Sequence, residues 1–181
     1  MNRIACLLFL FLGGCAATGP GVRLPNSDKA TVVKELDTRT DWQGKRVAVE
    51  GYVFLPGDSA DEENGRLKLA LFTKPMGAGD RLLDFQVASG GGPNQVNLPT
   101  VGKGKSAGYR TTSYQVDLAE SKVTLADGSA RELKSKVLLS GTVKYVPLMD
   151  GGFSHMEDPL HKGVQLYPFT LESIRFDPVR P

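Results

Sequence analysis

Residues 44–56 read GKRVAVEGYVFLP and predict the strand around which the chain folds. Val47, Val49 and Val53 fall on one side of this segment and the residues between them on the other, which is the alternation of a β-strand with one buried face. Gly51 occupies the inward position between Val49 and Val53. Because a glycine inside a strand marks a bend, a bulge or a close backbone approach, we expect the strand to bend there.

A second segment, residues 136–147, repeats this pattern as KVLLSGTVKYVP. When Gly141 is placed on Gly51, three apolar residues of the second segment coincide with the three valines of the first, and both segments end in a proline. The coinciding residues are Val137, Leu139, Val143 and Pro147 with Val47, Val49, Val53 and Pro56. Two long strands with a glycine bend are suited to a small curled β-barrel.

The amino-terminal residues predict an export signal. A positively charged start at residues 1–3 precedes an apolar run over residues 4–12, which is too short to span a bilayer as a helix. The run ends in Leu12-Gly13-Gly14-Cys15, which resembles the lipobox of bacterial lipoproteins. The resemblance implies that Cys15 becomes the first residue of the mature chain and carries the lipid anchor.

The same resemblance implies that residues 1–14 are the signal peptide and that the mature chain begins at Cys15. Together with the composition of the chain, it leads us to expect the lipidated cysteine with a flexible tether at residues 15–25 and a single β domain at residues 26–181. Ala16, directly after the cysteine, implies sorting to the outer membrane with the domain facing the periplasm. The alternative is an ordinary secretory signal that is cleaved near Ala16 or Ala17.

Composition limits the remaining possibilities. The chain has 181 residues, of which 40% are hydrophobic and 23% charged, and this is compatible with one globular domain. The net charge of +2 is spread along the chain and gives no electrostatic footprint for nucleic acid. Of the two cysteines, Cys6 is lost with the signal and Cys15 is consumed by lipidation, so we expect no disulfide and no thiol chemistry in the folded part.

The rest of the chain predicts one helix and several more strands. A capping residue and helical spacing predict a helix over residues 28–36, which we expect to cover an open end or a seam of the barrel. The Asp127-Gly128 pair predicts a hairpin turn, whose returning strand merges through Arg131 and Leu133 into the second glycine-bent strand. Further strands are expected at 66–73, 82–88, 114–118, 122–125 and 164–176, a solvated acidic loop at 55–65, and loops at 89–108 and 151–163.

The lead into the first strand also carries a resemblance. Asp41-Trp42, then Gly44-Lys45 and the alternating valines that end in Gly51-Tyr52-Val53 resemble the opening strand of OB-fold-like domains in bacterial envelope proteins. The resemblance implies a mainly β fold, a small OB-like barrel with extra strands and one short amino-terminal helix. A β-sandwich is the alternative. Trp42 is expected to pack in the core or plug one end of the barrel.

One loop holds both histidines of the chain. His155, Glu157 and His161 form an order of ligands that zinc or copper accepts, but the segment contains a proline and has no helical period that would fix their geometry. Metal binding, or an enzyme centred on this loop, is therefore kept as the alternative function. No serine elbow or other catalytic constellation is present in the sequence, so we expect neither catalytic activity nor a cofactor.

A binding module is the function class that the sequence favours. OB-like barrels bind ligands on one curved face through aromatic side chains beside basic ones. The candidates by residue type are Tyr52, Phe54, Tyr109, Arg110, Tyr114 and Tyr145, and the alternative is that most of them pack in the core. We therefore predict a lipid-anchored binding or assembly module of the cell envelope, whose ligand is a peptide, a glycan or another envelope protein, with no nucleic acid.

Overall fold

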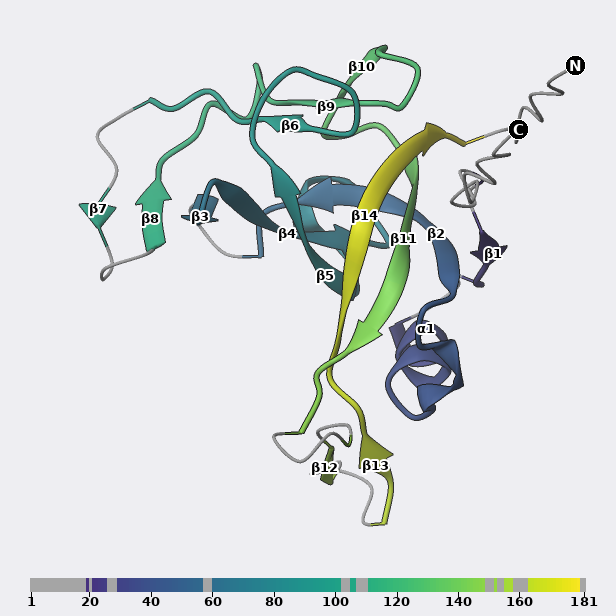
Figure 1. The fold of residues 1–181 in the computed structure, drawn as a ribbon. Coiled ribbons are helices and arrows are strands. Elements are labelled where there is room, and N and C mark those ends of the chain that lie inside the picture. The colour runs from purple at the N-terminus through teal and green to yellow at the C-terminus, as the bar shows by residue number, and fades with distance from the viewer. Residues whose placement is uncertain are drawn as a thin grey trace, which may run out of the picture.

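The strand predicted from residues 44–56 is β2 (Arg46–Phe54), and it connects the two halves of the main sheet in the computed structural model (Figure 1). The structure describes residues 19, 21–25, 29–56, 60–101, 105–106, 111–148, 152, 155–157 and 163–179, and the statements below concern these residues. They form several antiparallel sheets and one short α-helix, α1 (Lys29–Leu36). The prediction of a mainly β domain with a short amino-terminal helix is thus confirmed.

The partner of β2 changes at Gly51. From Arg46 to Gly51 the strand pairs with β11 (Val137–Tyr145), and from Tyr52 to Phe54 it pairs with β4 (Arg66–Phe72), both antiparallel. A Cβ atom added at Gly51 would lie 2.6 Å from Leu71 Cγ and 2.8 Å from the backbone oxygen of Phe72. The close backbone approach expected at this glycine is confirmed.

The two glycine-bent segments are neighbours in the sheet. β11 is the segment that repeats the pattern of β2, and Gly141 lies opposite Val47 in the register that joins them. On its other edge β11 pairs with β14 (Phe169–Pro178), and the register shifts there between Ser140 and Thr142. The extra residues of β14 at this shift include Ser173, whose φ is 52°, so Gly141 lies at a β-bulge.

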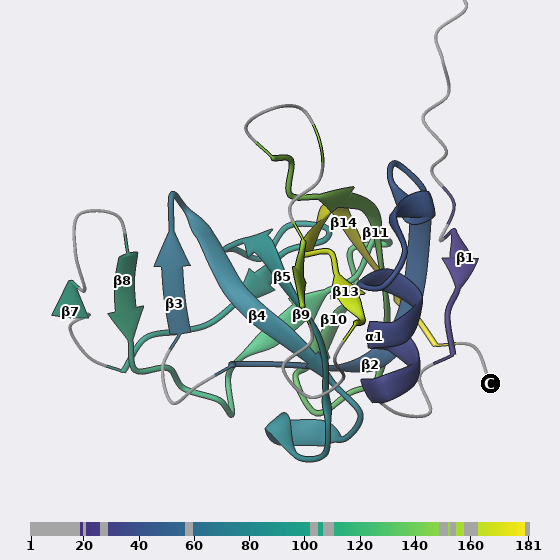
Figure 2. The same ribbon diagram turned by 90° about the horizontal axis from the view of Figure 1, so that it is seen from below.

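Part of the main sheet curls so that β5 approaches β14 (Figure 2). β5 (Arg81–Ala88) pairs with β4, so that β5, β4, β2, β11 and β14 follow one another, and β5 then contacts β14. The rings of Phe85 and Phe176 meet there edge to face, with their centroids 6.0 Å apart. The result is a barrel-like core with a seam between β5 and β14.

The other strands extend this core. In the main sheet, β1 (Val22–Arg23) pairs with β2, and β3 (Ala60–Glu63) pairs with β4. β8 (Thr111–Tyr114) then pairs with β3, and β7 (Lys105–Ser106) pairs with β8. A three-stranded sheet contains β6 (Val96–Asn97), β9 (Lys122–Thr124) and β10 (Ala130–Glu132), and a two-stranded ribbon contains β12 (Met156–Glu157) and β13 (Gln165–Leu166). Two 3₁₀ turns, η1 (Thr40–Trp42) and η2 (Pro75–Gly77), complete the elements.

The core contains the residues that the alternating patterns predict to point inward. All six apolar residues of the matched segments are buried, as are Leu67, Leu69 and Leu71 of β4. Helix α1 covers one end of the barrel with Val32 and Leu36, and Trp42 is half-buried against the same core. The expectations for the helix and for the tryptophan therefore agree with the structure.

Three expectations about loops are wrong. Residues 60–63 of the predicted acidic loop form β3, because Asn64 and Gly65 both adopt positive φ and make a tight hairpin turn into β4. The predicted loop at 89–108 includes β6 and β7, with Val96 fully buried, and the loop at 151–163 includes β12. These strands are only two to four residues long, and β3 and β6 also pair with distant segments, β8 and β9, so they leave little alternation in the sequence.

Several strand boundaries also differ from the prediction. β10 ends at Glu132 and a turn separates it from β11, so the two strands belong to different sheets instead of merging. The strand expected at 114–118 ends at Tyr114, and the one expected at 164–176 is split at Tyr167 and Pro168 into β13 and β14. The Asp127-Gly128 turn is confirmed, since Gly128 has a φ of 83° between β9 and β10.

The outward side of β2 is also covered, contrary to the expectation of one buried face. Ala48 and Glu50 are buried although they point away from the valines. β1 pairs in parallel with Val47 and Ala48, and the side chains of Arg23 and Lys136 both form ion pairs with Glu50. Residues 21–25, expected to be part of a flexible tether, thus belong to the folded domain.

Candidate binding cleft at the seam

The seam between β5 and β14 is not closed by strand pairing. Among the described residues, no backbone hydrogen bond joins β5 to β14. The carboxyl-terminal half of β14 is covered, because the Ala126 amide donates to the Phe176 carbonyl oxygen and the Phe176 amide donates to Asn94 Oδ1. The amino-terminal half, which starts at Phe169, borders an open cleft instead.

Backbone groups of β14 point into this cleft. The Val146 amide donates to the Pro168 carbonyl oxygen at 2.9 Å, which makes Tyr145 and Phe169 a non-hydrogen-bonded pair of the antiparallel ladder. The amide and carbonyl groups of Phe169 itself therefore point away from β11 and toward the seam. This part of β14 is a free strand edge.

The cleft consists of two adjoining hollows. The first, of about 510 Å³, lies between α1, β5 and the connection from β11 to β14 (residues 146–168, called the arm below), and the second, of about 240 Å³, continues toward β3. Phe169, Arg81 and Asp84 border both. The other lining residues are Val32, Asp37, Leu82, Leu83, Met156, Leu166 and Pro168 in the first hollow, and Pro56, Asp61, Lys68, Leu69, Phe85, Gln86 and Thr170 in the second.

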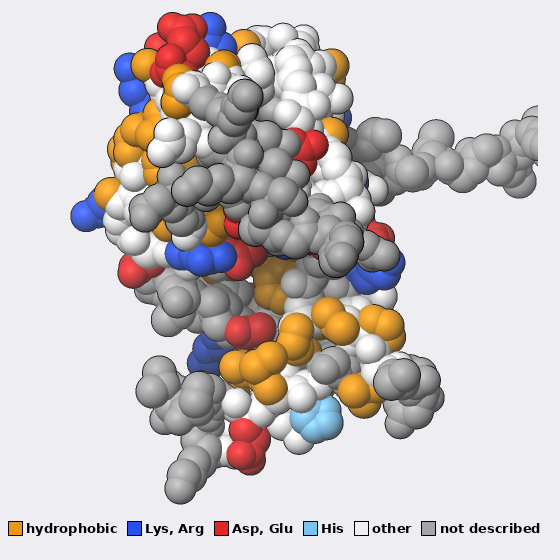
Figure 3. All heavy atoms as spheres, turned by 90° about the vertical axis from the view of Figure 1, so that its left-hand side faces the viewer, with side chains coloured by type: hydrophobic (Ala, Val, Ile, Leu, Met, Phe, Trp, Pro, Cys, Tyr) orange, Lys and Arg blue, Asp and Glu red, His pale blue; other side chains and the backbone are white. Residues whose placement is uncertain are grey.

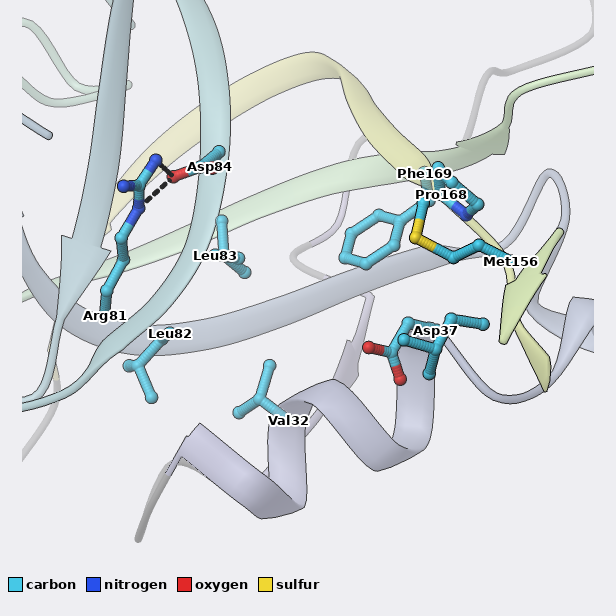
Figure 4. A pocket seen from close by; sticks show the side chains of 10 residues that line it. Val32, Asp37, Arg81, Leu82, Leu83, Asp84, Met156, Pro168 and Phe169 are labelled. Carbon is cyan, nitrogen blue, oxygen red and sulfur yellow. Dashed lines mark hydrogen bonds and ion pairs between the residues drawn. The ribbon is translucent and has the colours of Figure 1, made fainter. Parts of the chain in front are cut away.

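The lining is apolar inside and charged at the rim. In Figure 4 the Phe169 ring points across the first hollow toward Leu83, with Val32 of α1 below and Met156 beside the ring. At the rim, Arg81 Nε donates to Asp84 Oδ1 at 2.6 Å. Such a lining fits a ligand that buries an apolar group and presents polar groups at its edges.

Side chains of both charges line the second hollow, namely Asp61, Asp84, Lys68 and Arg81. β3 supplies Asp61, Glu62 and Glu63, and the nearby base Lys68 is 2.7 Å from Glu63. The hydrogen bond to Glu63 raises the pKa of Lys68, and the charges of Glu63 and Asp61 act in the same direction. Lys68 therefore stays charged and paired with Glu63, as Arg81 is with Asp84.

An aromatic cluster fixes the base of the arm to the barrel. The Tyr145 ring contacts the rings of Tyr167 and Phe169 edge to face, at centroid distances of 6.5 and 6.2 Å. The Tyr145 hydroxyl donates to the carbonyl oxygens of Leu36 and Arg39, and burial raises the pKa of Tyr145 to about 12. The Tyr167 amide donates to the Asp37 carbonyl oxygen, which ties the arm to the end of α1.

Figure 3 shows this side of the molecule in space-filling form. The face is hollowed, with hydrophobic side chains in and below the hollow and acidic and basic side chains around it. His155 belongs to the arm, and its ring is 6.2 Å from that of Tyr167. The arm therefore forms one wall of the cleft.

The aromatic residues chosen from the sequence do not form this site. Tyr145 is only 1% exposed and packs in the core, while Phe54 is half-buried against the ring of Phe72. Tyr52 is half-buried on β2, and Tyr114 ends β8. The described lining of the cleft includes neither Tyr52 nor Phe54 nor Tyr145, and Tyr109 and Arg110 lie outside the described residues.

The predicted metal ligands are described only in part. His155 and Glu157 are both exposed, two residues apart on the arm, whereas His161 lies outside the described residues, as does Cys15. Within the described part of the chain, no three histidine, cysteine, aspartate or glutamate side chains gather as a metal ion would require. Metal binding by the three predicted residues stays a prediction.

Sequence reasoning missed the residues that line the cleft, although one signal was available. Leu82 and Leu83 are adjacent in β5 and are both buried, so apolar side chains point to both faces of that strand. A strand of this kind must be covered on its outer face as well. The covering elements, α1 and the arm, meet β5 from distant parts of the chain.

Two further findings bear on function. Across the described residues, none of the helices has the length and apolar character needed to cross a membrane. Comparison of the chain with protein-family models, with curated proteins and with solved structures finds no match.

Proposed function

We propose that this chain is a lipid-anchored, non-catalytic binding module of a bacterial cell envelope, and that it holds an extended segment of another envelope protein in the seam cleft. The observation that carries the proposal is the open seam itself. A free strand edge at Phe169 borders an apolar hollow, and these are the two features that strand addition uses. Main-chain hydrogen bonds supply affinity in this mode, and pockets for alternate side chains supply specificity.

The strand order supports a binding role at this place. β2, β4, β5, β11 and β14 correspond in order to the strands of a five-stranded OB barrel, a fold that binds its ligands with the second and third strands and with the loops that follow the first and fourth. The corresponding parts here are β4 and β5, the 55–65 connection and the arm. The second hollow is bordered by Asp61 of this connection and by Phe85 of β5, and the arm supplies Met156 to the first.

The chemistry of the lining favours a peptide over a glycan. A sugar needs a flat aromatic platform with convergent polar groups, whereas Phe169 points across an apolar hollow whose other walls are aliphatic. An extended peptide places an apolar side chain in the hollow and offers its backbone to the strand edge.

The membrane anchor rests on the Leu12-Gly13-Gly14-Cys15 motif. One acyl chain binds a membrane only marginally, so the several chains of a lipoprotein cysteine are what make the attachment firm. The attachment keeps the module near partners in the same envelope, where the local concentration of a partner replaces part of the binding affinity.

Site-specific photo-crosslinking in the native envelope tests the binding proposal. A photoreactive phenylalanine analogue replaces Met156, which is 52% exposed at the cleft, or Met76, which is 48% exposed on η2 and lines neither hollow. We expect a discrete adduct with another envelope protein from position 156 and none from position 76. Equal adducts from both positions, or none from position 156, contradict the proposal.

A further inference from the structure

The β1 segment (residues 21–24) fixes the amino-terminal end of the domain to the barrel. Val22 and Arg23 pair in parallel with β2, and the Leu24 amide donates to the Ala48 carbonyl oxygen at 2.8 Å. Leu24 is buried, and Arg23 forms an ion pair with Glu50. The chain therefore leaves the barrel surface at Gly21.

The bend of β2 provides the place where β1 pairs. β4 pairs with β2 only from Tyr52 onward, so the edge of β2 at Val47 and Ala48 is available to β1. Gly21 has a φ of 82°, and a Cβ atom there would lie 2.3 Å from the Arg46 carbonyl oxygen. Position 21 therefore requires a glycine, both for its positive φ and for its close approach to the Arg46 backbone.

The face around β1 is basic. It holds four cationic side chains, Arg23, Arg46, Lys136 and Arg175, and two carboxylates, Glu50 and Asp177. A cavity of about 480 Å³ opens beside β1, with Arg23, Leu138, Arg175 and Pro178 in its walls.

The Arg46 guanidinium donates hydrogen bonds to uncharged oxygen atoms of two described serines. It donates to the Ser173 carbonyl oxygen and to Ser140 Oγ, each at 3.0 Å. Burial, and then the charge of Arg175, lower its pKa, while the charge of Asp177 acts in the opposite direction. An anion placed near Arg46 would interact favourably with its charge.

The distance to the anchor is short. Five residues lie between Cys15 and Gly21, and the six steps from one to the other reach about 20 Å in a fully extended chain. From this, together with the charge of the face, we infer that the β1 face of the barrel lies against the bilayer, with lipid phosphate groups opposite its arginine and lysine side chains. The inference rests on the proposed lipid anchor, and not on the ligand of the seam cleft.

This orientation directs the cleft away from the bilayer. β1 lies at the right of Figure 1, on the opposite side from the hollowed face that Figure 3 presents. A partner in the periplasm then reaches the cleft without displacing lipid.

Depth measurement on the lipidated protein tests the inference. Once Cys15 is lipidated and Cys6 removed, an introduced cysteine is the only thiol, so a fluorophore can be attached at one position. Pro178→Cys labels the β1 face far from the anchor in sequence, and Met156→Cys labels the arm. In vesicles of phosphatidylglycerol and phosphatidylethanolamine with a headgroup quencher, we expect at least threefold stronger quenching at position 178. Equal quenching at the two positions overturns the inference.

A charge variant tests the role of phosphate groups. Lys136→Gln removes a cation from the β1 face, just before β11, and leaves Glu50 paired with Arg23. The control Lys144→Gln removes a cation near the far end of β11, where Lys144 pairs with Glu172. We expect the first variant, and high salt, to reduce the difference in quenching, and the control to preserve it. If both variants behave alike, lipid phosphate does not hold this face.

Acyl labelling separates failure of the anchor from failure of the orientation. A protein that carries no acyl label refutes the anchor and the orientation together. A labelled protein with equal quenching at both positions refutes the orientation alone, and the crosslink from position 156 is unaffected by either result.

Discussion

Gly51→Ala tests whether the bend of β2 depends on the missing side chain. The new Cβ would lie 2.6 Å from Leu71 Cγ and 2.8 Å from the Phe72 backbone oxygen, both closer than any relaxed contact. Leu71 is fully buried, and the Phe72 backbone belongs to the ladder between β2 and β4, so neither can withdraw freely. Overpacking of this kind costs about 1–3 kcal/mol, and we expect a loss of about 2 kcal/mol.

The assay is urea unfolding of the domain without its lipid, with the free energy of unfolding obtained by linear extrapolation. Gly91→Ala is the matched control, because its φ is ordinary and no atom lies within 4 Å of the added Cβ. The double variant Gly51→Ala with Leu71→Ala should lose less than the two single variants added together, since the smaller side chain relieves the clash. A change below about 0.5 kcal/mol for Gly51→Ala would refute the reasoning.

Three further predictions concern other side chains. Tyr145→Phe should lose about 1–2 kcal/mol in urea unfolding at pH 7, because two carbonyl oxygens lose their donor. Burial raises the Tyr145 pKa from 10.0 to about 12, so the unfolded state loses its proton at a lower pH than the folded state. The stability of the wild type should therefore fall as the pH rises from 10 toward 12, and the Phe variant should lack this contribution to the fall. Glu50→Gln leaves Arg23 and Lys136 without their shared carboxylate and should cost about 1–2 kcal/mol in the same assay; an unchanged midpoint would contradict the pairing. Cys15→Ala should release the protein from the membrane fraction and abolish acyl labelling, and unchanged membrane association would count against the anchor.

The core was predictable because its signals are local. The alternation around Gly51 and Gly141, and the positive φ that Gly128 supplies, depend on residues close together in the chain. The Asn64-Gly65 turn was also readable, since an Asn-Gly pair between strands predicts a hairpin. The acidic composition of residues 58–63 favoured a loop there, but β3 pairs along one edge with β4 and along the other with β8, and its acidic residues stay partly exposed.

The cleft and the β1 segment were not predictable in the same way. Val22 and Arg23 make a strand only because a bend elsewhere in the chain frees an edge of β2 for them. Phe169, Leu83 and Met156 become neighbours only when β5, β14 and the arm are assembled. No spacing within one segment encodes such a contact, and the composition of residues 16–25 alone favours a flexible tether.

One structural feature, the change of partner at Gly51, underlies both proposed surfaces. At this residue β2 stops pairing with β11 and begins to pair with β4. β5 pairs with the other edge of β4 and therefore faces β14, across a seam that no described backbone hydrogen bond closes. The change of partner also leaves the β2 edge at Val47 and Ala48 free for β1. A substitution that straightened β2 at Gly51 would therefore disturb the cleft and the attachment of β1 together. A Met156 variant, by contrast, affects only the cleft, and a Lys136 variant affects only the β1 face.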